Sequence, residues 1–121
     1  MYNIILVFLG SGLGGALRWL ISTALNATYP IGTMTVNVVG CLLIGMLNAW
    51  IAHLAPSSDV WRLLLVVGFC GGFTTFSTFA NENVMMLRGG QLFECVLYTA
   101  ASVILGFLAV WIGGKIINYE L

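Results

Sequence analysis

One uncharged polar stretch interrupts the third apolar segment of the chain, and it reads Gly71-Gly72-Phe73-Thr74-Thr75-Phe76-Ser77-Thr78-Phe79. Adjacent glycines are poor helix formers, and the hydroxyls that follow them can bond carbonyls locally. We expect a helix entering from Leu63 to unwind at the glycines and to restart near Thr74, so that it is broken near Gly71 to Thr75. Freed backbone groups at bilayer depth are tolerated where they are buried in protein, line a polar cavity or bind an ion. The break is therefore a candidate site.

The composition indicates an all-α integral membrane protein. Of the 121 residues, 60% are hydrophobic and 7% are charged, and the mean hydropathy is +1.05. Because a spanning helix takes about 20 residues, the chain has room for one four-span membrane domain over residues 1–121 and for no catalytic module. We therefore predict that it is not an enzyme. The predicted spans are 2–26, 33–54, 61–87 with the central break, and 92–117.

The few charges of the chain balance in number and in position. A net charge of zero argues against a nucleic acid partner. With four spans, Arg62 and Lys115 flank one side of the membrane, while Arg88 and an outward-leaning Arg18 flank the other. Two against two gives almost no orientation preference under the positive-inside rule. The sequence thus permits a dual-topology, antiparallel homodimer with a two-fold axis in the membrane plane, which would bring two copies of the break together.

Four polar residues inside the spans, two of them taken together as a pair, have two interpretations each. Arg18 either snorkels or makes a structural pairing, or it attracts anions directly. The Asn37 amide either bonds a neighbouring helix or offers a donor to an anion. Tyr98 and Ser102, one turn apart, either anchor and pack the fourth span or belong to a polar pathway.

The stretch itself also has a packing and a binding interpretation. Phe76 and Phe79 are three residues apart on one helix face, with Ser77 and Thr78 between them, and Glu82 lies further along that face. Packing aromatics and hydroxyls that bond carbonyls would explain this pattern. Alternatively, ring edges carry partial positive charge and hydroxyls donate hydrogen bonds, so together they can replace the hydration shell of a small anion.

The unwound backbone suggests a second ligand. Hard cations are bound by oxygen atoms, and carbonyls at Gly71 and Thr74 from two symmetry-related breaks could enclose a monovalent cation at a dimer centre.

The residues also match a known family. The run Gly68-Phe69-Cys70-Gly71-Gly72-Phe73-Thr74-Thr75-Phe76-Ser77-Thr78-Phe79, with Glu82 following, resembles the central segment of the CrcB/Fluc fluoride channels. Gly15-Ala16-Leu17-Arg18-Trp19, and Gly32-Thr33-Met34-Thr35-Val36-Asn37 with Gly40 and Gly45, match the first two spans. The resemblance covers nearly the whole chain. One departure is Ala80, where many members have Ser.

The resemblance implies an antiparallel dual-topology homodimer with two fluoride pores and a structural, non-transported Na⁺ at its centre. It implies backbone carbonyls of Gly71 and Thr74 as Na⁺ ligands, and Glu82 and Arg18 as polar-track or electrostatic support. The pore residues that it implies are Asn37, Phe76, Ser77, Thr78, Phe79, Tyr98 and Ser102.

The function that we expect is passive, fluoride-selective export from the cytoplasm across the cell membrane, the inner membrane if the source is Gram-negative. HF enters cells as a neutral molecule and dissociates inside, and an inside-negative potential drives F⁻ out. A small dual-topology multidrug exporter is the main alternative, but it would need a membrane-embedded carboxylate in the first span, which has none. A structural subunit without transport activity would leave the Phe-Ser-Thr-Phe run unexplained.

Overall fold

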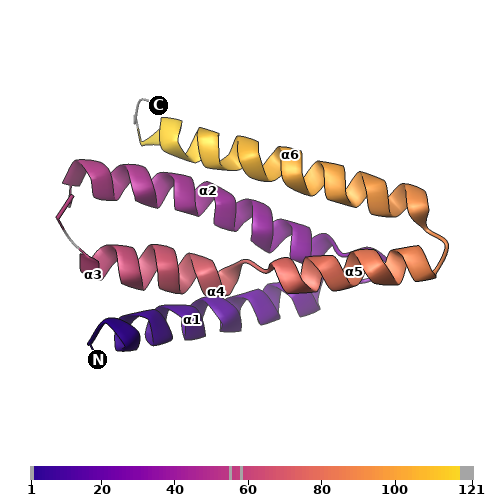
Figure 1. Cartoon of the computed structure of the whole chain (residues 1–121), viewed down its shortest axis with the longest axis horizontal. Coiled ribbons are helices and arrows are strands. Elements are labelled where there is room, and N and C mark those ends of the chain that lie inside the picture. Colours follow the sequence, from indigo (N-terminus) through magenta and orange to yellow (C-terminus); the bar gives the residue numbers. More distant parts are fainter. Residues whose placement is uncertain (1, 55, 58, 118–121) are drawn as a thin grey trace.

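The computed structural model describes residues 2–54, 56–57 and 59–117, and the regular elements of this part of the chain are all helical (Figure 1). Four helical stretches of the described residues are long and apolar enough to cross a membrane, which confirms the predicted number. The elements are α1 (Tyr2–Leu25), α2 (Ile31–Leu54), α3 (Asp59–Trp61), the π-helix η1 (Arg62–Cys70), α4 (Gly71–Phe73), α5 (Phe76–Arg88) and α6 (Leu92–Ile116).

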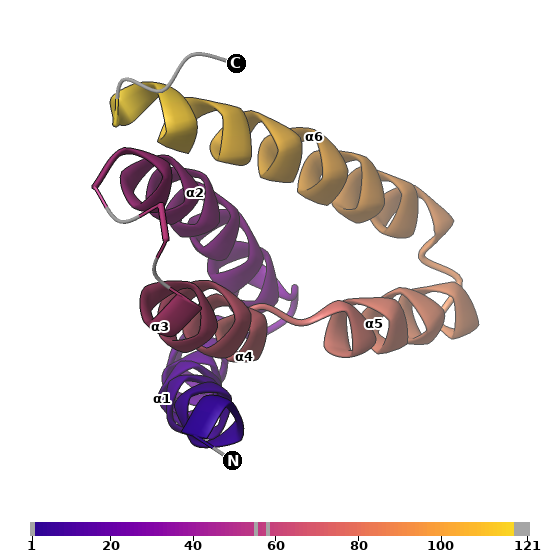
Figure 2. The ribbon, with the colours of Figure 1, turned by 60° about the vertical axis from the view of Figure 1, so that its left-hand side comes forward.

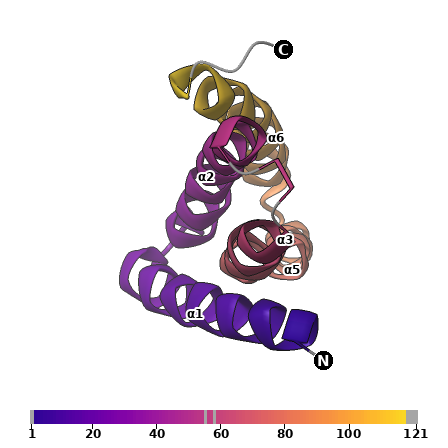
Figure 3. The ribbon, with the colours of Figure 1, turned by 90° about the vertical axis from the view of Figure 1, so that its left-hand side faces the viewer.

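The helices form an antiparallel bundle in which the third span lies between the others. The start of α1 and the end of α6 lie at one end of the bundle, together with the end of α2 and with α3 (Figure 1). Seen along the bundle, α1 lies on one side of the third span, and α2 and α6 lie on the other (Figure 3). Beyond α4, α5 diverges from α1 and α2 and connects to α6 through a tight turn (Figure 2).

Small residues allow the helix backbones to approach one another. A Cβ atom on Gly14 would collide with the Phe69 carbonyl, which brings α1 against η1. A Cβ atom on Gly113 would collide with the Leu42 carbonyl, which brings α6 against α2. Such contacts are the usual means by which spanning helices associate, since lipid tails are as apolar as the side chains that they would replace.

The glycine pair does not unwind, so that part of the sequence-based expectation is wrong. Gly71 has helical dihedral angles (φ −62°, ψ −38°) and begins the helical turn α4. The extended residues are Thr74 (φ −90°, ψ 160°) and Thr75 (φ −151°, ψ 122°), and α5 restarts at Phe76 rather than at Thr74. Gly72 remains in the helix because its bare backbone lies against the Ser11 backbone of α1, where a Cβ atom would collide. The glycine provides close packing here, and the β-branched threonines adopt the extended conformation.

Candidate functional site

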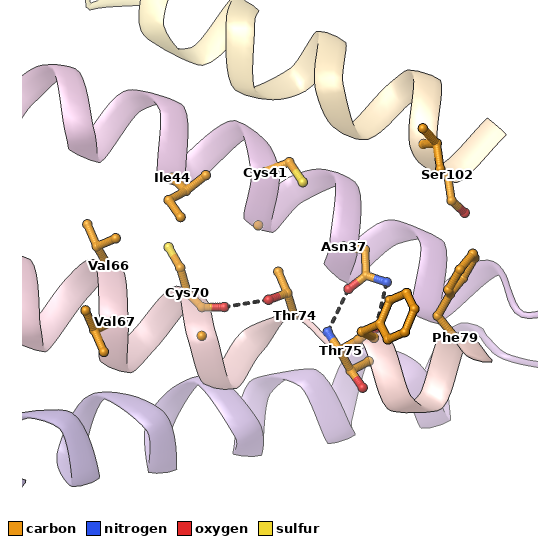
Figure 4. A pocket seen from close by; sticks show the side chains of 14 residues that line it. Asn37, Cys41, Ile44, Val66, Val67, Cys70, Thr74, Thr75, Phe79 and Ser102 are labelled. Atoms are coloured by element: carbon orange, nitrogen blue, oxygen red, sulfur yellow. Dashed lines mark hydrogen bonds between the residues drawn. The ribbon is translucent and has the colours of Figure 1, made fainter. Parts of the chain in front are cut away.

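A cavity of about 520 Å³ lies beside the extended residues, between α2, the third span and α6 (Figure 4). Its wall includes six of the eleven residues that the sequence singled out, together with apolar side chains from α2 and η1. These six are Asn37, Gly71, Thr74, Phe76, Phe79 and Ser102. The structure therefore brings together residues that lie as far apart in sequence as the second and fourth spans.

Asn37 bonds the extended backbone directly. Its Oδ1 accepts the N–H of Thr75 at 2.8 Å, and its Nδ2 donates to the carbonyl of the same residue at 3.1 Å (Figure 4). Asn37 therefore joins α2 to the extended residues between α4 and α5. A primary amide carries two N–H donors, and this pair of bonds uses one of them. The side chain can therefore fix the backbone and still offer a donor to the cavity.

The extended residues leave two backbone carbonyls of the third span without the N–H donors that a continuous helix would give them. In a continuous helix the N–H of Thr75 would donate to the carbonyl of Gly71, but here it donates to Asn37. The N–H of Thr78 would likewise donate to the carbonyl of Thr74, but it donates to the Thr75 Oγ1 at 3.1 Å. Gly71 and Thr74 thereby lose their helical donors. Two carbonyl oxygens in this condition fit the oxygen ligands that a hard monovalent cation requires.

Arg18 reaches the third span from α1. Its Nε donates to the carbonyl of Gly72 at 3.0 Å. In a continuous helix that carbonyl would accept the N–H of Phe76, which instead begins α5. Arg18 thus makes a structural pairing that caps the end of α4, and its charge lies next to the interruption.

Three aromatic rings follow one another along the cavity and beyond it. The centroids of Phe76 and Phe79 are 5.9 Å apart, and those of Phe79 and Tyr98 are 5.0 Å apart, with tilted planes in both pairs. Phe76 is 78% exposed on the single chain and stands at the open side of the cavity, whereas Phe79 is half-buried. In tilted pairs of this kind, a C–H edge of one ring approaches the other ring.

Glu82 joins two helices beside these rings. Its Oε1 accepts the hydroxyl of Tyr98 at 2.8 Å, and its Oε2 accepts the hydroxyl of Thr33 at 2.7 Å. Thr33 is fully buried and also accepts a hydrogen bond from the Asn26 amide at 3.3 Å. Tyr98 lines a second cavity of about 820 Å³ between α2 and α6. Phe79, which lines the first cavity, therefore contacts Tyr98, which lines the second, and Glu82 bonds the Tyr98 hydroxyl.

Sequence reasoning missed Thr33 and Asn26. Thr33 precedes Asn37 by four residues, so both lie on one face of α2 and project toward the third span. That spacing was the available signal for Thr33. Asn26 lies in the link before α2, where its Oδ1 accepts the N–H of Gly32 at 2.7 Å. Its other bond, from Nδ2 to the Thr33 hydroxyl, follows from no pattern in the neighbouring sequence.

The remaining hydroxyls have different environments. The Thr75 Oγ1 lies 3.3 Å from the Ser77 Oγ, and Ser77 is exposed on the single chain. Thr78 is half-buried and is held through its backbone N–H. Among the residues that the structure describes, the Ser102 Oγ is a buried side-chain oxygen without a hydrogen-bond partner. Figure 4 shows Ser102 projecting from α6 toward the cavity that Phe79 also lines. A buried hydroxyl of this kind is a candidate ligand group because leaving it unpaired is costly.

The chain is similar to a known family and to proteins that carry functional names. The family described as "CrcB-like protein, Camphor Resistance (CrcB)" matches residues 5–114. A protein of Phocaeicola vulgatus named "Fluoride-specific ion channel FluC" is 40% identical over 117 residues, covering 93% of this chain and 96% of the relative. Proteins of the same name are 39% identical in Flavobacterium psychrophilum (93% and 94% covered) and 41% identical in Serratia proteamaculans (93% and 98% covered).

Proposed function

The chain belongs to the CrcB-like family, and from this membership we propose that it is a fluoride-selective passive ion channel. The observation that carries the proposal is the identity of about 40% to relatives named as fluoride-specific ion channels, over more than nine-tenths of both chains. With four helical stretches of its described residues long and apolar enough to cross a membrane, it is a multi-pass membrane protein. The function is transport rather than catalysis.

The fluoride pathway that we propose follows the aromatic rings. Fluoride is small and strongly hydrated, so a pathway must replace its water with other partners. The ring edges of Phe76 and Phe79, the spare N–H of Asn37 and the unpaired hydroxyl of Ser102 provide such partners beside one cavity. Ser77, Thr78 and Tyr98 extend the series of hydroxyls along α5 and α6, with Glu82 and Arg18 as polar support.

The proposal includes the broken third span as the centre of a homodimer. A spanning chain with extended residues and polar side chains on an open cavity would expose them to lipid, which is unfavourable. A second copy related by a two-fold axis in the membrane plane would cover them. The balanced charges allow the opposite insertion that an antiparallel dimer needs, and such a dimer would hold two equivalent pores.

A structural Na⁺ fits the same arrangement. Gly71 and Thr74 line the open cavity, and both carbonyls have lost their helical donors. Their counterparts in a second copy would complete a set of oxygen ligands. The ion would neutralise carbonyl dipoles and hold the two copies together, without being transported.

The direction of flow would follow from the membrane potential. An inside-negative potential drives F⁻ out of the cytoplasm, so a passive pathway suffices for export. We propose the cell membrane as the location, the inner membrane in a Gram-negative source.

Ion flux from liposomes tests the proposal. Purified protein is reconstituted into vesicles loaded with potassium fluoride or potassium chloride, and efflux is followed after valinomycin is added. We expect rapid fluoride efflux and little chloride efflux, with no need for a proton gradient. Equal permeation by the two anions would contradict selectivity, and efflux that stops when the proton gradient is collapsed would favour the exporter alternative.

A further inference from the structure

Asn83 joins α5 to α6 through a single side-chain amide. Its Oδ1 accepts hydrogen bonds from the Cys95 Sγ and from the Thr99 Oγ1, each at 3.1 Å. Its Nδ2 donates to the carbonyl of Phe79 at 3.0 Å. The three bonds engage both ends of the amide, and two of them cross between helices. In a membrane an amide without such partners would be costly, so this arrangement stabilises the contact between the two helices.

These bonds flank the aromatic contact. Cys95 and Thr99 lie three residues before and one residue after Tyr98, whose ring is 5.0 Å from that of Phe79. On α5, the neighbouring residue Glu82 already bonds the Tyr98 hydroxyl. Adjacent residues on a helix project about 100° apart, so Glu82 and Asn83 attach α5 to α6 at two different angles. Glu82 is also held by the Thr33 hydroxyl of α2, and the bonds to Asn83 add a further restraint on the rotation of α5 about its own axis.

The third bond of Asn83 links this restraint to Phe79, a residue of the proposed fluoride pathway. The carbonyl of Phe79 lies one turn before Asn83, so it accepts the side-chain amide as well as the backbone N–H of the same residue in the helix. The turn of α5 that carries the Phe79 ring is therefore tied to α6 through Asn83.

We propose that Asn83 is a positioning residue, which sets the orientation of the Phe79 ring against Tyr98 and thereby the selectivity for fluoride. This role rests on the proposed function. Asn83 itself does not line either cavity described above; it acts through Phe79. A ring that can rotate presents its edge for only part of the time, so an anion loses the partner that distinguishes fluoride from chloride.

The test uses the full chain, four variants and the combination of two of them. Asn83→Leu removes the amide, and the double variant Cys95→Ala/Thr99→Val removes the donors of α6 while keeping Asn83. Cys95→Ser/Thr99→Ser keeps a hydrogen-bond donor at both positions, a hydroxyl in place of the Cys95 thiol and a hydroxyl at residue 99. Asn81→Leu is the matched control, because Asn81 is exposed on the same helix two residues away.

The main readouts are the ratio of fluoride to chloride efflux and the nuclear Overhauser contact between the Phe79 and Tyr98 rings in detergent. We expect Asn83→Leu and Cys95→Ala/Thr99→Val each to lower the ratio about tenfold, the equivalent of one or two hydrogen bonds, and to weaken the ring contact. The serine double variant and Asn81→Leu should keep both at the wild-type level. Combining Asn83→Leu with Cys95→Ala/Thr99→Val should add little to Asn83→Leu alone, since Asn83→Leu already removes both bonds that Cys95 and Thr99 make to this amide.

Three outcomes would overturn the role. One is an Asn83→Leu protein with a lower melting temperature but an unchanged ratio and ring contact, which would make Asn83 merely structural. Another is an unchanged ratio of fluoride to chloride efflux in Cys95→Ala/Thr99→Val. If Asn83→Leu does not fold, this second variant alone tests the positioning role. A third is a ring contact that survives in Asn83→Leu. A wild-type protein without fluoride efflux would instead contradict the proposed function, and the ring contact would still report whether Asn83 positions Phe79.

Discussion

The carboxamide of Asn37 and the backbone of Thr75 form a reciprocal pair: the Thr75 N–H donates to the Asn37 Oδ1, and the Asn37 Nδ2 donates to the Thr75 carbonyl. The two bonds measure 2.8 and 3.1 Å and join residues 38 positions apart. The pair resembles the exchange between two strands, and it gives extended backbone a partner inside a helical bundle. Without it, both polar groups of Thr75 would lie unpaired at the centre of a spanning chain, at a cost of about 1–3 kcal/mol each.

Replacing Asn37 by Asp tests this pair. The substitution keeps an acceptor for the Thr75 N–H but removes the donor to its carbonyl, and it places an acidic group beside the proposed path of an anion. We expect fluoride efflux to fall on the order of a hundredfold, since a charge at this depth costs about 3 kcal/mol. Asn48→Asp, on the same helix but at an exposed position outside the cavity, should retain most of the flux. Equal losses in both variants would contradict a specific role for Asn37.

Replacing Phe76 by Ile tests the ring edges. The side chain stays apolar but loses its positive edge, so we expect fluoride efflux to drop up to about tenfold while the protein remains folded. Phe107→Ile is a matched control, because both phenylalanines are 78% exposed on the single chain and Phe107 lies outside the cavity. Liposome efflux and size-exclusion profiles measure the two effects. A Phe76→Ile protein with wild-type efflux would remove this ring from the pathway.

Replacing Arg18 by Lys separates charge from hydrogen bonding. Lys keeps the positive charge but lacks the planar guanidinium that aims Nε at the Gly72 carbonyl. We expect a loss of about 1–3 kcal/mol in unfolding free energy, because the carbonyl is left without its donor. Arg62→Lys, exposed at the far end of the third span, should change stability little. If Arg18 acted through charge alone, Arg18→Lys would match the wild type in both stability and efflux.

Replacing Tyr98 by Phe removes one bond from Glu82 and leaves the ring in place. Of the hydrogen bonds from Tyr98 and Thr33, the Glu82 carboxylate then keeps the one from the Thr33 hydroxyl. We expect the free energy of unfolding to fall by about 1.5–3 kcal/mol, the usual contribution of a hydrogen bond to a charged group, and fluoride efflux to slow. Tyr2→Phe, near the exposed start of α1, is the control. Unchanged stability in Tyr98→Phe would mean that this bond does not contribute to the joint between α5 and α6.

Replacing Gly14 by Ala tests the close packing of α1 on the third span. The new methyl group would collide with the Phe69 carbonyl, and the resulting backbone shift should cost about 1–3 kcal/mol. Gly12→Ala on the same helix meets no atom within 4 Å and should be neutral or slightly stabilising. Melting temperatures in detergent compare the two. A larger loss in Gly12→Ala than in Gly14→Ala would contradict the packing described above.

The sequence by itself determined the membrane class, the four spans and the family, because apolar length and a long motif are properties of neighbouring residues. The predicted spans 2–26 and 92–117 correspond to helices Tyr2–Leu25 and Leu92–Ile116. The assignment of pore residues, the sodium ligands and the dimer stay predictions.

Only the tertiary structure decided where the third span leaves the helical conformation and what holds it there. Propensity favoured unwinding at Gly71 and Gly72, yet contact with α1 keeps Gly72 helical, and the extended residues are Thr74 and Thr75. The bonds from Arg18 and Asn37 join residues 54 and 38 positions apart. A hydrogen-bond partner that comes from another helix leaves no periodic pattern in the chain, so local propensity cannot reveal it.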